Sequence, residues 1–245
     1  MKDYRRMIDR LAVSGHAVAL TGAGISVESG IPDFRSAGGL WSKYDPMEYA
    51  HIQSFRSNPA RVWQLLWELD QLLGGAEPNP AHMALAELER RGIIKEVITQ
   101  NVDSLHQRAG SRTVIEFHGH NRALRCEECS RRFMREAVRF DTLPPACSCG
   151  GPLRPEIVFF GELIPSDALE HAMEAARVCD FLMIVGTSAS VAPASQIPRI
   201  AKSRGAFLLE VNPGASELPA GMVDFRIPLP AGVALPAIVT ALLGD

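Results

Sequence analysis

Five short apolar runs, separated by segments with helical patterns, constrain the fold of this chain more than any other feature. The runs are rich in Val, Ile, Leu and Ala and end in glycine or small polar residues, as buried parallel strands do. Strands that alternate with helices form a parallel sheet with helices on both faces, so we expect an α/β fold. The expected strands are His16–Gly24, Ile93–Asn101, Thr113–His120, Phe181–Gly186 and Ala206–Asn212.

Helical patterns between these runs predict the covering helices. A chain of 245 residues, 47% of them hydrophobic, can bury a sizeable core in one large domain or in a domain with a smaller insert. Asp33–Tyr49 mixes glycine, proline and aromatic residues, and we expect it to be irregular. The expected helices are Met1–Ser14, Asn58–Leu73, Pro80–Arg91, a short helix in Val102–Gly110, Ser166–Cys179, a proline-bearing helix between Ser188 and Ala206, and Leu235–Gly244.

The charge and hydropathy of the chain argue against several classes of function. A net charge of −3 creates no overall field that would recruit nucleic acid or an anionic membrane. Apolar runs stay well short of the ~20 residues that a membrane helix needs, and the charged N-terminal segment does not resemble a signal peptide. We therefore expect a cytoplasmic protein, by default a monomer, whose 5 cysteines are metal ligands or free thiols.

The first expected strand runs into a glycine turn, Gly22-Ala23-Gly24. Such a turn lets backbone N–H groups approach a pyrophosphate. Val27 stands where a dinucleotide-binding fingerprint has its third glycine. The segment Gly30–Arg35 contains a proline, an aromatic residue and two charged residues, where the fingerprint would continue into a long helix. On these residues alone, a tight turn without a ligand is an equally good interpretation.

Small and hydrogen-bonding residues also collect at the other strand ends, where ligands bind in such folds. Thr187 and Ser188 can donate to phosphate or ribose, or cap a helix. Asn212 can hold a ribose hydroxyl, or start a turn before Pro213. The residues at these ends are Gly22, Ala23, Gly24, Gln100, Asn101, Asp103, His118, Gly186, Thr187, Ser188, Asn212 and Gly214.

His118 is the best candidate for a general base. An imidazole can accept a proton near neutral pH, although a lone histidine at a strand end is more often structural. Gln100, Asn101 and Asp103 are expected on the neighbouring strand end, which favours the catalytic interpretation. His120 is a competitor and ranks lower, because it falls where the chain leaves the strand.

Two close pairs of cysteines indicate a structural zinc site. Cys126-x-x-Cys129 and Cys147-x-Cys149 supply the four thiolates of a closed tetrahedral site, with no position left for an activated water. Free thiols are the alternative, since the second pair is one residue shorter than usual. Cys179 lies apart, in an apolar helical pattern, and is expected in the core. The nearby arginines are interpreted as a solvated face rather than a nucleic-acid surface.

Together these segments resemble the sirtuin family of NAD-dependent protein deacylases. The matching pieces follow the family's order and span nearly the whole chain, so the combination is far more specific than any one piece. The pieces are GAGISVESGIPDFRS, TQNVD, FHGH, the two cysteine pairs, LRPEIVFFGE, GTSASVAP and EVNPG.

The resemblance implies a large Rossmann-like domain that binds NAD and a small domain that carries structural zinc. The implied large domain comprises residues 1–33, 80–119 and 158–245. Residues 34–79 and 120–157 form the implied small domain.

The resemblance also implies a cofactor site. The loop that contains Asp33, Phe34 and Arg35 becomes a flexible cover over NAD rather than a failed helix. Asn101 and Asp103 hold the nicotinamide end in this interpretation. The implied NAD-binding residues are Gly22, Ala23, Gly24, Asp33, Phe34, Arg35, Gln100, Asn101, Asp103, His118, Gly186, Thr187, Ser188, Asn212, Gly214 and Ala231.

By the same resemblance, NAD is a co-substrate of lysine deacylation. The acyl oxygen attacks the ribose as nicotinamide leaves, and His118, with Asn101 beside it, takes a proton from a ribose hydroxyl. The products are free lysine, nicotinamide and O-acetyl-ADP-ribose. The substrate peptide is expected to pair as an added strand. The implied substrate-binding residues are Phe34, Leu66, Leu69, Val158, Phe159, Phe160, Gly161 and Glu162.

The acyl preference follows from one helix. Sirtuins that remove succinyl or malonyl groups carry Tyr-x-x-Arg there, and the arginine pairs with the acyl carboxylate. The equivalent residues in this chain are Leu66 and Leu69, and Glu68 between them would repel an anion if its side chain pointed inward. We therefore expect a neutral acyl group, acetyl or a longer apolar chain, although these leucines could equally be core residues.

Three rival functions are weighed against deacylation. An ADP-ribosyltransferase would use the same cleavage of NAD, and the sequence does not exclude it. An NAD sensor or nucleic-acid binder has no need of a base such as His118 beside the ribose. A dehydrogenase is disfavoured by the missing third glycine and by the lack of an acidic residue about 20 positions after the glycine turn.

Overall fold

The larger of two sheets forms the centre of the molecule. A computed structural model describes residues 2–34 and 38–244. The strands of this sheet are β1 (Ala17–Thr21), β2 (Ile94–Thr99), β3 (Val114–Glu116), β7 (Phe181–Val185), β8 (Phe207–Val211) and β9 (Phe225–Ile227). They are all parallel, in the order β3-β2-β1-β7-β8-β9. The order reverses at β1 and β7, which is where an open α/β sheet binds its ligands.

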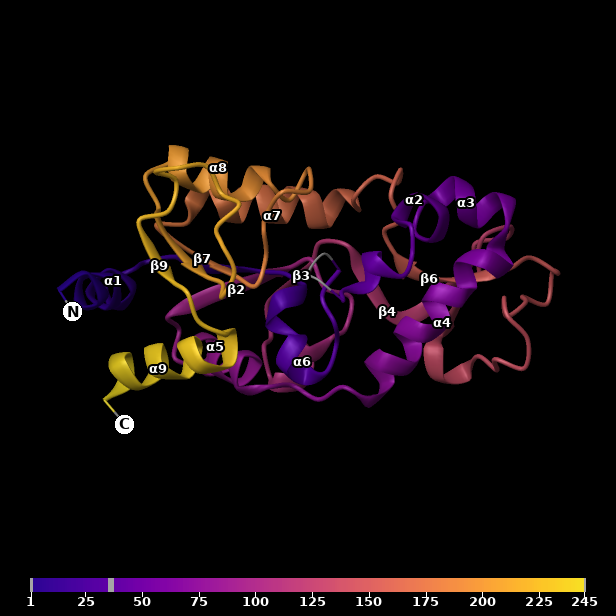
Figure 1. Cartoon of the computed structure of the whole chain (residues 1–245), viewed down its shortest axis with the longest axis horizontal. Helices are drawn as coiled ribbons and strands as arrows, with labels where there is room; N and C mark the ends of the chain where they lie inside the picture. The colour runs from indigo at the N-terminus through magenta and orange to yellow at the C-terminus, as the bar shows by residue number, and fades with distance from the viewer. Residues whose placement is uncertain (1, 35–37, 245) are drawn as a thin grey trace.

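Helices lie on both faces of this sheet. They are α1 (Lys2–Ala12), α5 (Pro80–Arg90), α6 (Leu105–Ala109), α7 (Ser166–Val178), α8 (Gln196–Ser203) and α9 (Ala231–Leu243). Figure 1 shows α7 and α8 above the sheet and α5 and α9 below it. Within residues 2–34 and 38–244, no helix combines the length and the apolar character that a membrane span requires.

Alternation of side chains along each strand produces the two cores. In β1, Ala17 and Ala19 join the core formed with α1, α5 and α9, whereas Val18 and Leu20 join the core formed with α7 and α8. Both faces of β1 are therefore buried, as its continuous apolar run predicts. The predicted α/β fold with helices on both faces is confirmed.

A second, antiparallel sheet lies beside the first, toward the right of Figure 1. Its strands are β4 (Gly119–Cys126), β5 (Arg132–Met134) and β6 (Leu153–Ile157), in the order β5-β4-β6. Three helices accompany it, α2 (Pro46–Tyr49), α3 (Ile52–Ser57) and α4 (Pro59–Gly75). The indole Nε1 of Trp63 in α4 donates to Leu153 O at 2.8 Å, which fixes the helix to the sheet.

The predicted single strand Thr113–His120 is wrong. β3 ends at Glu116, and at Gly119 the chain enters β4, which belongs to the second sheet. Gly119 has φ 75°, and a Cβ there would lie 2.1 Å from Glu156 O, so only glycine fits this junction. As a result, His118 stands where the chain passes from one sheet to the other.

The remaining differences from prediction are short elements. Helix α3 and strands β5, β6 and β9 were not predicted, and the segment expected to be irregular contains the one-turn helix α2. Helices α4 and α5 begin where their prolines indicate, whereas α9 begins at Ala231, four residues before the predicted Leu235, and contains Pro236 in its interior. Asn58 and Asn79 cap α4 and α5 through their side chains, and proline follows at the first helical position of each.

Candidate active site

The glycine turn after β1 packs tightly against the end of β7. Gly22 N–H donates to Val185 O at 3.1 Å, and Gly24 N–H donates to Gly186 O at 2.8 Å. A Cβ on Gly22 would lie 2.6 Å from Thr187 Cβ, and one on Gly24 would lie 2.7 Å from Gly186 Cα. Close approach of two backbones therefore requires these glycines, and it brings the predicted residues of β1 and β7 together at the point where the strand order reverses.

Ala23 and Val27 begin two one-turn 3₁₀ helices that follow the turn, η1 (Ala23–Ile25) and η2 (Val27–Ser29). Each is a single turn of helix, and η2 ends at Gly30 with φ 85°. The long helix of an ordinary dinucleotide fingerprint is thus replaced by a sharply turning segment, as the sequence pattern indicates.

The end of β2 supplies amide and carboxylate groups to the same place. Gln100 Nε2 donates to Thr187 Oγ1 at 2.9 Å, across the site from β2 to the end of β7. Asn101 is buried, and its Nδ2 donates to Gly22 O at 3.1 Å. The structure therefore brings these predicted residues within hydrogen-bonding distance of the glycine turn.

Ser26 is a site residue that was not predicted from the sequence. Its Oγ donates to Asp103 Oδ2 at 2.7 Å and accepts from Asn101 Nδ2 at 3.1 Å, and the side chain is 1% exposed. The serine therefore joins the glycine turn to the residues after β2. Its place inside the motif GAGISVESG is the one signal in the sequence that could have marked it.

Two buried histidines lie beneath this turn and were also missed. His106 Nε2 is 2.9 Å from Thr21 Oγ1, and the ring of His82 meets that of His106 edge-on with centroids 4.9 Å apart. Burial lowers the pKa of His106 to about 3, with the charge of His82 as a lesser cause. Burial also lowers the pKa of His82. Both rings are therefore neutral at neutral pH.

His118 lies half-buried with one ring nitrogen held by the backbone. Its Nδ1 is 3.1 Å from Gln100 O. A carbonyl oxygen can only accept, so Nδ1 carries the proton and Nε2 keeps a lone pair in the neutral ring. Burial lowers the pKa of His118, and the hydrogen bond to Gln100 offsets part of that effect. His120, the competitor, lies 3.9 Å from Glu156 in the second sheet instead.

The cover loop is represented by Asp33 and Phe34, because Arg35 lies outside the described residues. Leu40 N–H donates to Asp33 O at 3.0 Å, and Trp41 N–H donates to Phe34 O at 2.9 Å, so the loop closes on itself. The rings of Phe34 and Trp41 are 5.1 Å apart, centroid to centroid. The loop therefore presents a pair of aromatic rings.

Several of the predicted NAD-binding residues follow β7 and β8. Ser188 Oγ lies 2.9 Å from Ser190 Oγ, and Asn212 Oδ1 accepts from Gly214 N–H at 3.4 Å in a turn. Gly186 has φ 59° and lies against the glycine turn. Ala231 is buried at the start of α9 and packs in the core formed with α1 and α5.

The predicted substrate segment, Val158–Glu162, begins directly beside the candidate base. Val158 N–H donates to His118 O at 2.9 Å. Phe160 is 39% exposed, and its ring centroid lies 6.3 Å from that of Trp41 in the cover loop. Phe159 is buried in the core of the second sheet.

The predicted acyl-pocket residues lie on α4. Leu66 is buried and Leu69 is half-buried. Glu68 is bonded to Lys43 and to the Tyr44 hydroxyl, and these hydrogen bonds lower the pKa of its carboxyl group. The carboxylate is thus charged and its nearest cation is already paired with it.

The four cysteines of the second sheet converge on one point. Cys126 Sγ lies 3.5 Å from Cys149 Sγ, and Cys129 Sγ lies 3.7 Å from Cys147 Sγ. All four sulfur atoms lie within 4.8 Å of one another. A tetrahedral zinc ion with Zn–S bonds of about 2.3 Å needs sulfur–sulfur edges of about 3.8 Å. The cysteines therefore fit the predicted structural zinc, and Cys179 lies in the core as predicted.

The fold and this site define an α/β dinucleotide-binding protein with an inserted four-cysteine module. The model of the Sir2 family matches residues 22–193. The chain is 44% identical over 236 residues to NAD-dependent protein deacylase 1 of Archaeoglobus fulgidus, with 96% of each chain covered.

Solved structures agree with this match. A mutant of a Sir2 homologue in complex with ADP-ribose has a TM-score of 0.93 at 42% identity, covering 98% of this chain and 96% of that one. A complex of Sir2 with a p53 peptide and NAD+ has a TM-score of 0.89 at 36% identity, covering 98% of both chains. The chain belongs to the Sir2 family, and the resemblance to sirtuins is confirmed.

Proposed function

We propose that this NAD-dependent protein deacylase removes uncharged acyl groups from lysine side chains, with His118 as the general base. The observation that carries the proposal is the tautomer of His118. Its Nδ1–H is held by Gln100 O, its pKa is lowered by burial, and its Nε2 is left to accept a proton. Bound NAD supplies the activated ribose that receives the acyl group, with nicotinamide and O-acetyl-ADP-ribose as products.

Residues at the carboxyl ends of the parallel strands support the NAD site. Gln100 and Thr187 meet across the site, and Asn101 is held against the glycine turn by Ser26. In the proposal, Asn101 orients the nicotinamide end, while Phe34 covers the reacting carbon and excludes water. The fit of this end of the sheet to a dinucleotide also rests on its position at the reversal of strand order.

The contacts of α4 support the preference for an uncharged acyl group. Leu66 and Leu69 offer no charge to pair with a carboxylate, and Lys43 is already bonded to Glu68. A succinyl or malonyl group would therefore lose the hydration of its carboxylate with no cation of α4 to replace it. We expect acetyl-lysine, or lysine with a longer apolar acyl chain, to be the substrate.

The four-cysteine module holds zinc as a structural ion in this proposal. The cysteine sulfurs occupy all four positions, so the metal has no place for substrate. We also propose that residues 34–79 and 120–157 form the small domain, that the enzyme is a cytoplasmic monomer, and that its partners are proteins with acylated lysines.

Nicotinamide release from NAD tests the proposal. We expect release to require an acetyl-lysine peptide and to yield deacetylated peptide, with little turnover of the succinyl-lysine counterpart. His118→Ala should lower kcat by about 100-fold or more, as loss of a general base does. His171→Ala, at an exposed histidine of α7, is the matched control and should behave as the wild type.

Two results would contradict parts of this assignment. Faster turnover of succinyl-lysine than of acetyl-lysine would refute the acyl preference. Transfer of label from NAD to protein, without deacylation of any acyl peptide, would favour an ADP-ribosyltransferase instead.

A further inference from the structure

The backbone of Val158–Glu162 is attached to the rest of the molecule at its first residue and at its middle residue. Beyond the hydrogen bond to His118, Phe160 N–H donates to Ala50 O at 2.9 Å, and Phe160 O accepts from Ile52 N–H at 3.0 Å. Gly161 has φ 84° and bends the segment. These bonds locate the segment, and inside it Glu162 N–H donates to Phe159 O at 3.0 Å, but none of them joins the two ends of the turn between Ile157 and Glu162.

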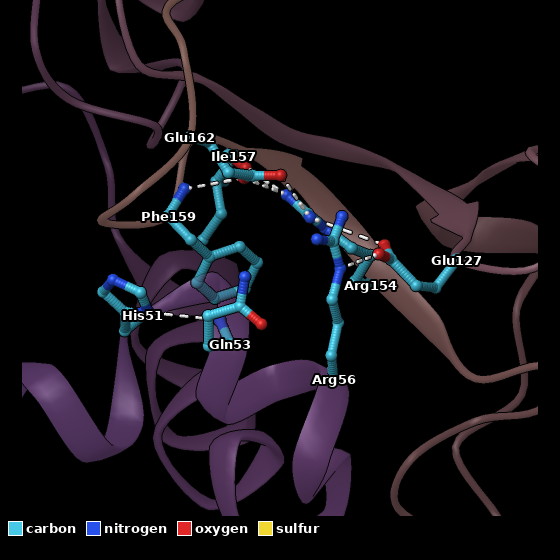
Figure 2. Close-up of polar contacts among 8 residues, drawn as sticks. All are labelled: His51, Gln53, Arg56, Glu127, Arg154, Ile157, Phe159 and Glu162. Carbon is cyan, nitrogen blue, oxygen red and sulfur yellow. Dashed lines mark hydrogen bonds and ion pairs between the residues drawn. The ribbon is translucent and has the colours of Figure 1, made fainter.

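The guanidinium of Arg154 closes that turn from inside the protein (Figure 2). Its Nη1 and Nη2 donate to the two carboxylate oxygens of Glu162 at 2.7 and 2.6 Å, and Nη2 also donates to Ile157 O at 2.8 Å. The carboxylate in turn accepts from Phe159 N–H at 2.9 Å. The Arg154 side chain therefore holds both ends of the turn, Ile157 and Glu162. Through the Glu162 carboxylate it also holds Phe159 in the middle.

Arg154 is buried, which makes this arrangement dependent on its partners. The residue is 2% exposed, and its guanidinium carbon lies 4.4 Å from the ring centroid of Phe159. A buried guanidinium needs nearby carboxylates to replace its lost hydration. A fork of donors on a planar group also matches carboxylate geometry in a way that a lysine ammonium cannot.

The second carboxylate near Arg154 comes from the zinc module. Glu127 follows the cysteine at position 126, and its Oε2 lies 3.6 Å from Arg154 Nη1. Its Oε1 accepts from Arg56 Nε of α3 at 2.8 Å. Figure 2 shows Glu127 to the right of both arginines, with dashed lines to each, and Glu162 on the opposite side of Arg154. Positive and negative groups alternate from α3 through the zinc module to the substrate segment.

We propose that Arg154 is a positioning residue that sets the peptide-binding shape of Val158–Glu162, and that Glu127 links this shape to the folded zinc module. The inference rests on the proposed role of that segment in binding substrate. If this role is correct, changes to Arg154 or Glu127 affect the binding of peptide and not the binding of NAD. Weakening the ion pairs of Arg154 with Glu162 and Glu127 should impair the binding of acyl peptide. The NAD site at the ends of β1, β2 and β7 should stay intact.

Steady-state kinetics of Arg154→Lys and Glu127→Gln test this consequence. We expect Arg154→Lys to raise the KM for acetyl-lysine peptide by about tenfold, because lysine loses the bidentate bond to Glu162 and the bond to Ile157. The KM for NAD should change less than about twofold. Glu127→Gln should raise the peptide KM by a smaller factor, about threefold, since it removes one charge and keeps the side-chain shape.

Arg132→Lys is the matched control, because Arg132 pairs with Glu156 on the exposed side of the same sheet. It should leave both KM values unchanged. Zinc content and melting temperature are measured on every variant, and direct titration of peptide onto the NAD-free protein gives the peptide affinity independently of turnover. Should Arg154→Lys fail to fold, Glu127→Gln and the peptide titration carry the test.

The outcomes separate the inference from the proposed function. One outcome is that the wild type deacylates the peptide while the variants keep the wild-type KM for peptide. That result would overturn the positioning role of Arg154 and Glu127 and leave the proposed function standing. A parallel rise of both KM values, or loss of zinc from Glu127→Gln, would also overturn the positioning role, because the role would then be general stability. A wild-type enzyme without peptide-dependent release of nicotinamide would overturn both.

Discussion

Acid should destabilise this protein through the histidines beneath the glycine turn, and His106 gives the clearest case. Its ring is 1% exposed and its pKa is lowered to about 3, against 6.5 in an unfolded chain. Between these values the unfolded chain binds the proton and the native protein does not, so stability falls as the pH falls. For this one group, linkage gives a loss of about 2 kcal/mol between pH 7 and pH 5.

The substitution His106→Gln isolates this contribution. Glutamine keeps an amide that can hydrogen-bond to Thr21, but it does not titrate. Urea unfolding, followed by tryptophan fluorescence at pH 7 and at pH 5, gives the free energy of unfolding of each protein. The wild type should lose about 2 kcal/mol more than the variant over this interval, whatever constant cost the substitution carries.

His171→Gln is the control, because His171 is exposed on α7 and its replacement should leave the pH dependence as in the wild type. Equal losses for wild type and His106→Gln would refute the reasoning. That result would mean that His106 is protonated as easily in the folded protein as in the unfolded chain.

Three further predictions concern the site and its supports. The kcat/KM for acetyl-lysine peptide should fall only on the acid side, with a midpoint below 6.5, because burial lowers the pKa of His118; a midpoint above 6.5 would contradict this. Gly119→Ala should reduce kcat by about tenfold or more, because its Cβ would lie 2.1 Å from Glu156 O and would displace the backbone beside His118. Gly205→Ala, also at positive φ but with open space around it, separates the clash from backbone strain. Removal of zinc by a chelator should abolish peptide-dependent activity and lower the melting temperature, and a metal-free protein with unchanged melting would exclude a structural ion.

The parallel sheet could be predicted from the sequence because each strand is a short apolar run that ends in glycine or a polar residue. The passage of the chain from the first sheet to the second, at His118, could not be predicted. The weak alternation of Thr113–His120 has no break at Phe117 or His118, and pattern alone does not say which neighbour a strand will pair with. The short strand β9 and helix α3 were missed for a related reason, since three to six residues give too little periodicity.

The site was predicted in outline, and its buried supports were not. The positions of Gln100 and Asn101 follow from the end of β2, and His118, two residues beyond β3, lies beside Gln100. Ser26 and His106 are polar residues whose partners lie far away in the chain, so no local pattern marks them. Arg154 likewise looks in the sequence like an ordinary surface charge, and only tertiary packing shows that it is buried.

The hydrogen bond between Val158 N–H and His118 O joins two places where the chain passes between the sheets. One passage runs from β3 to β4 through His118, and the other leaves β6 toward α7 through Val158. Rotation about such a joint displaces each atom in proportion to its distance from the joint. His118 therefore lies at this joint, so we expect any rotation of one sheet relative to the other to displace its imidazole less than atoms farther from the joint.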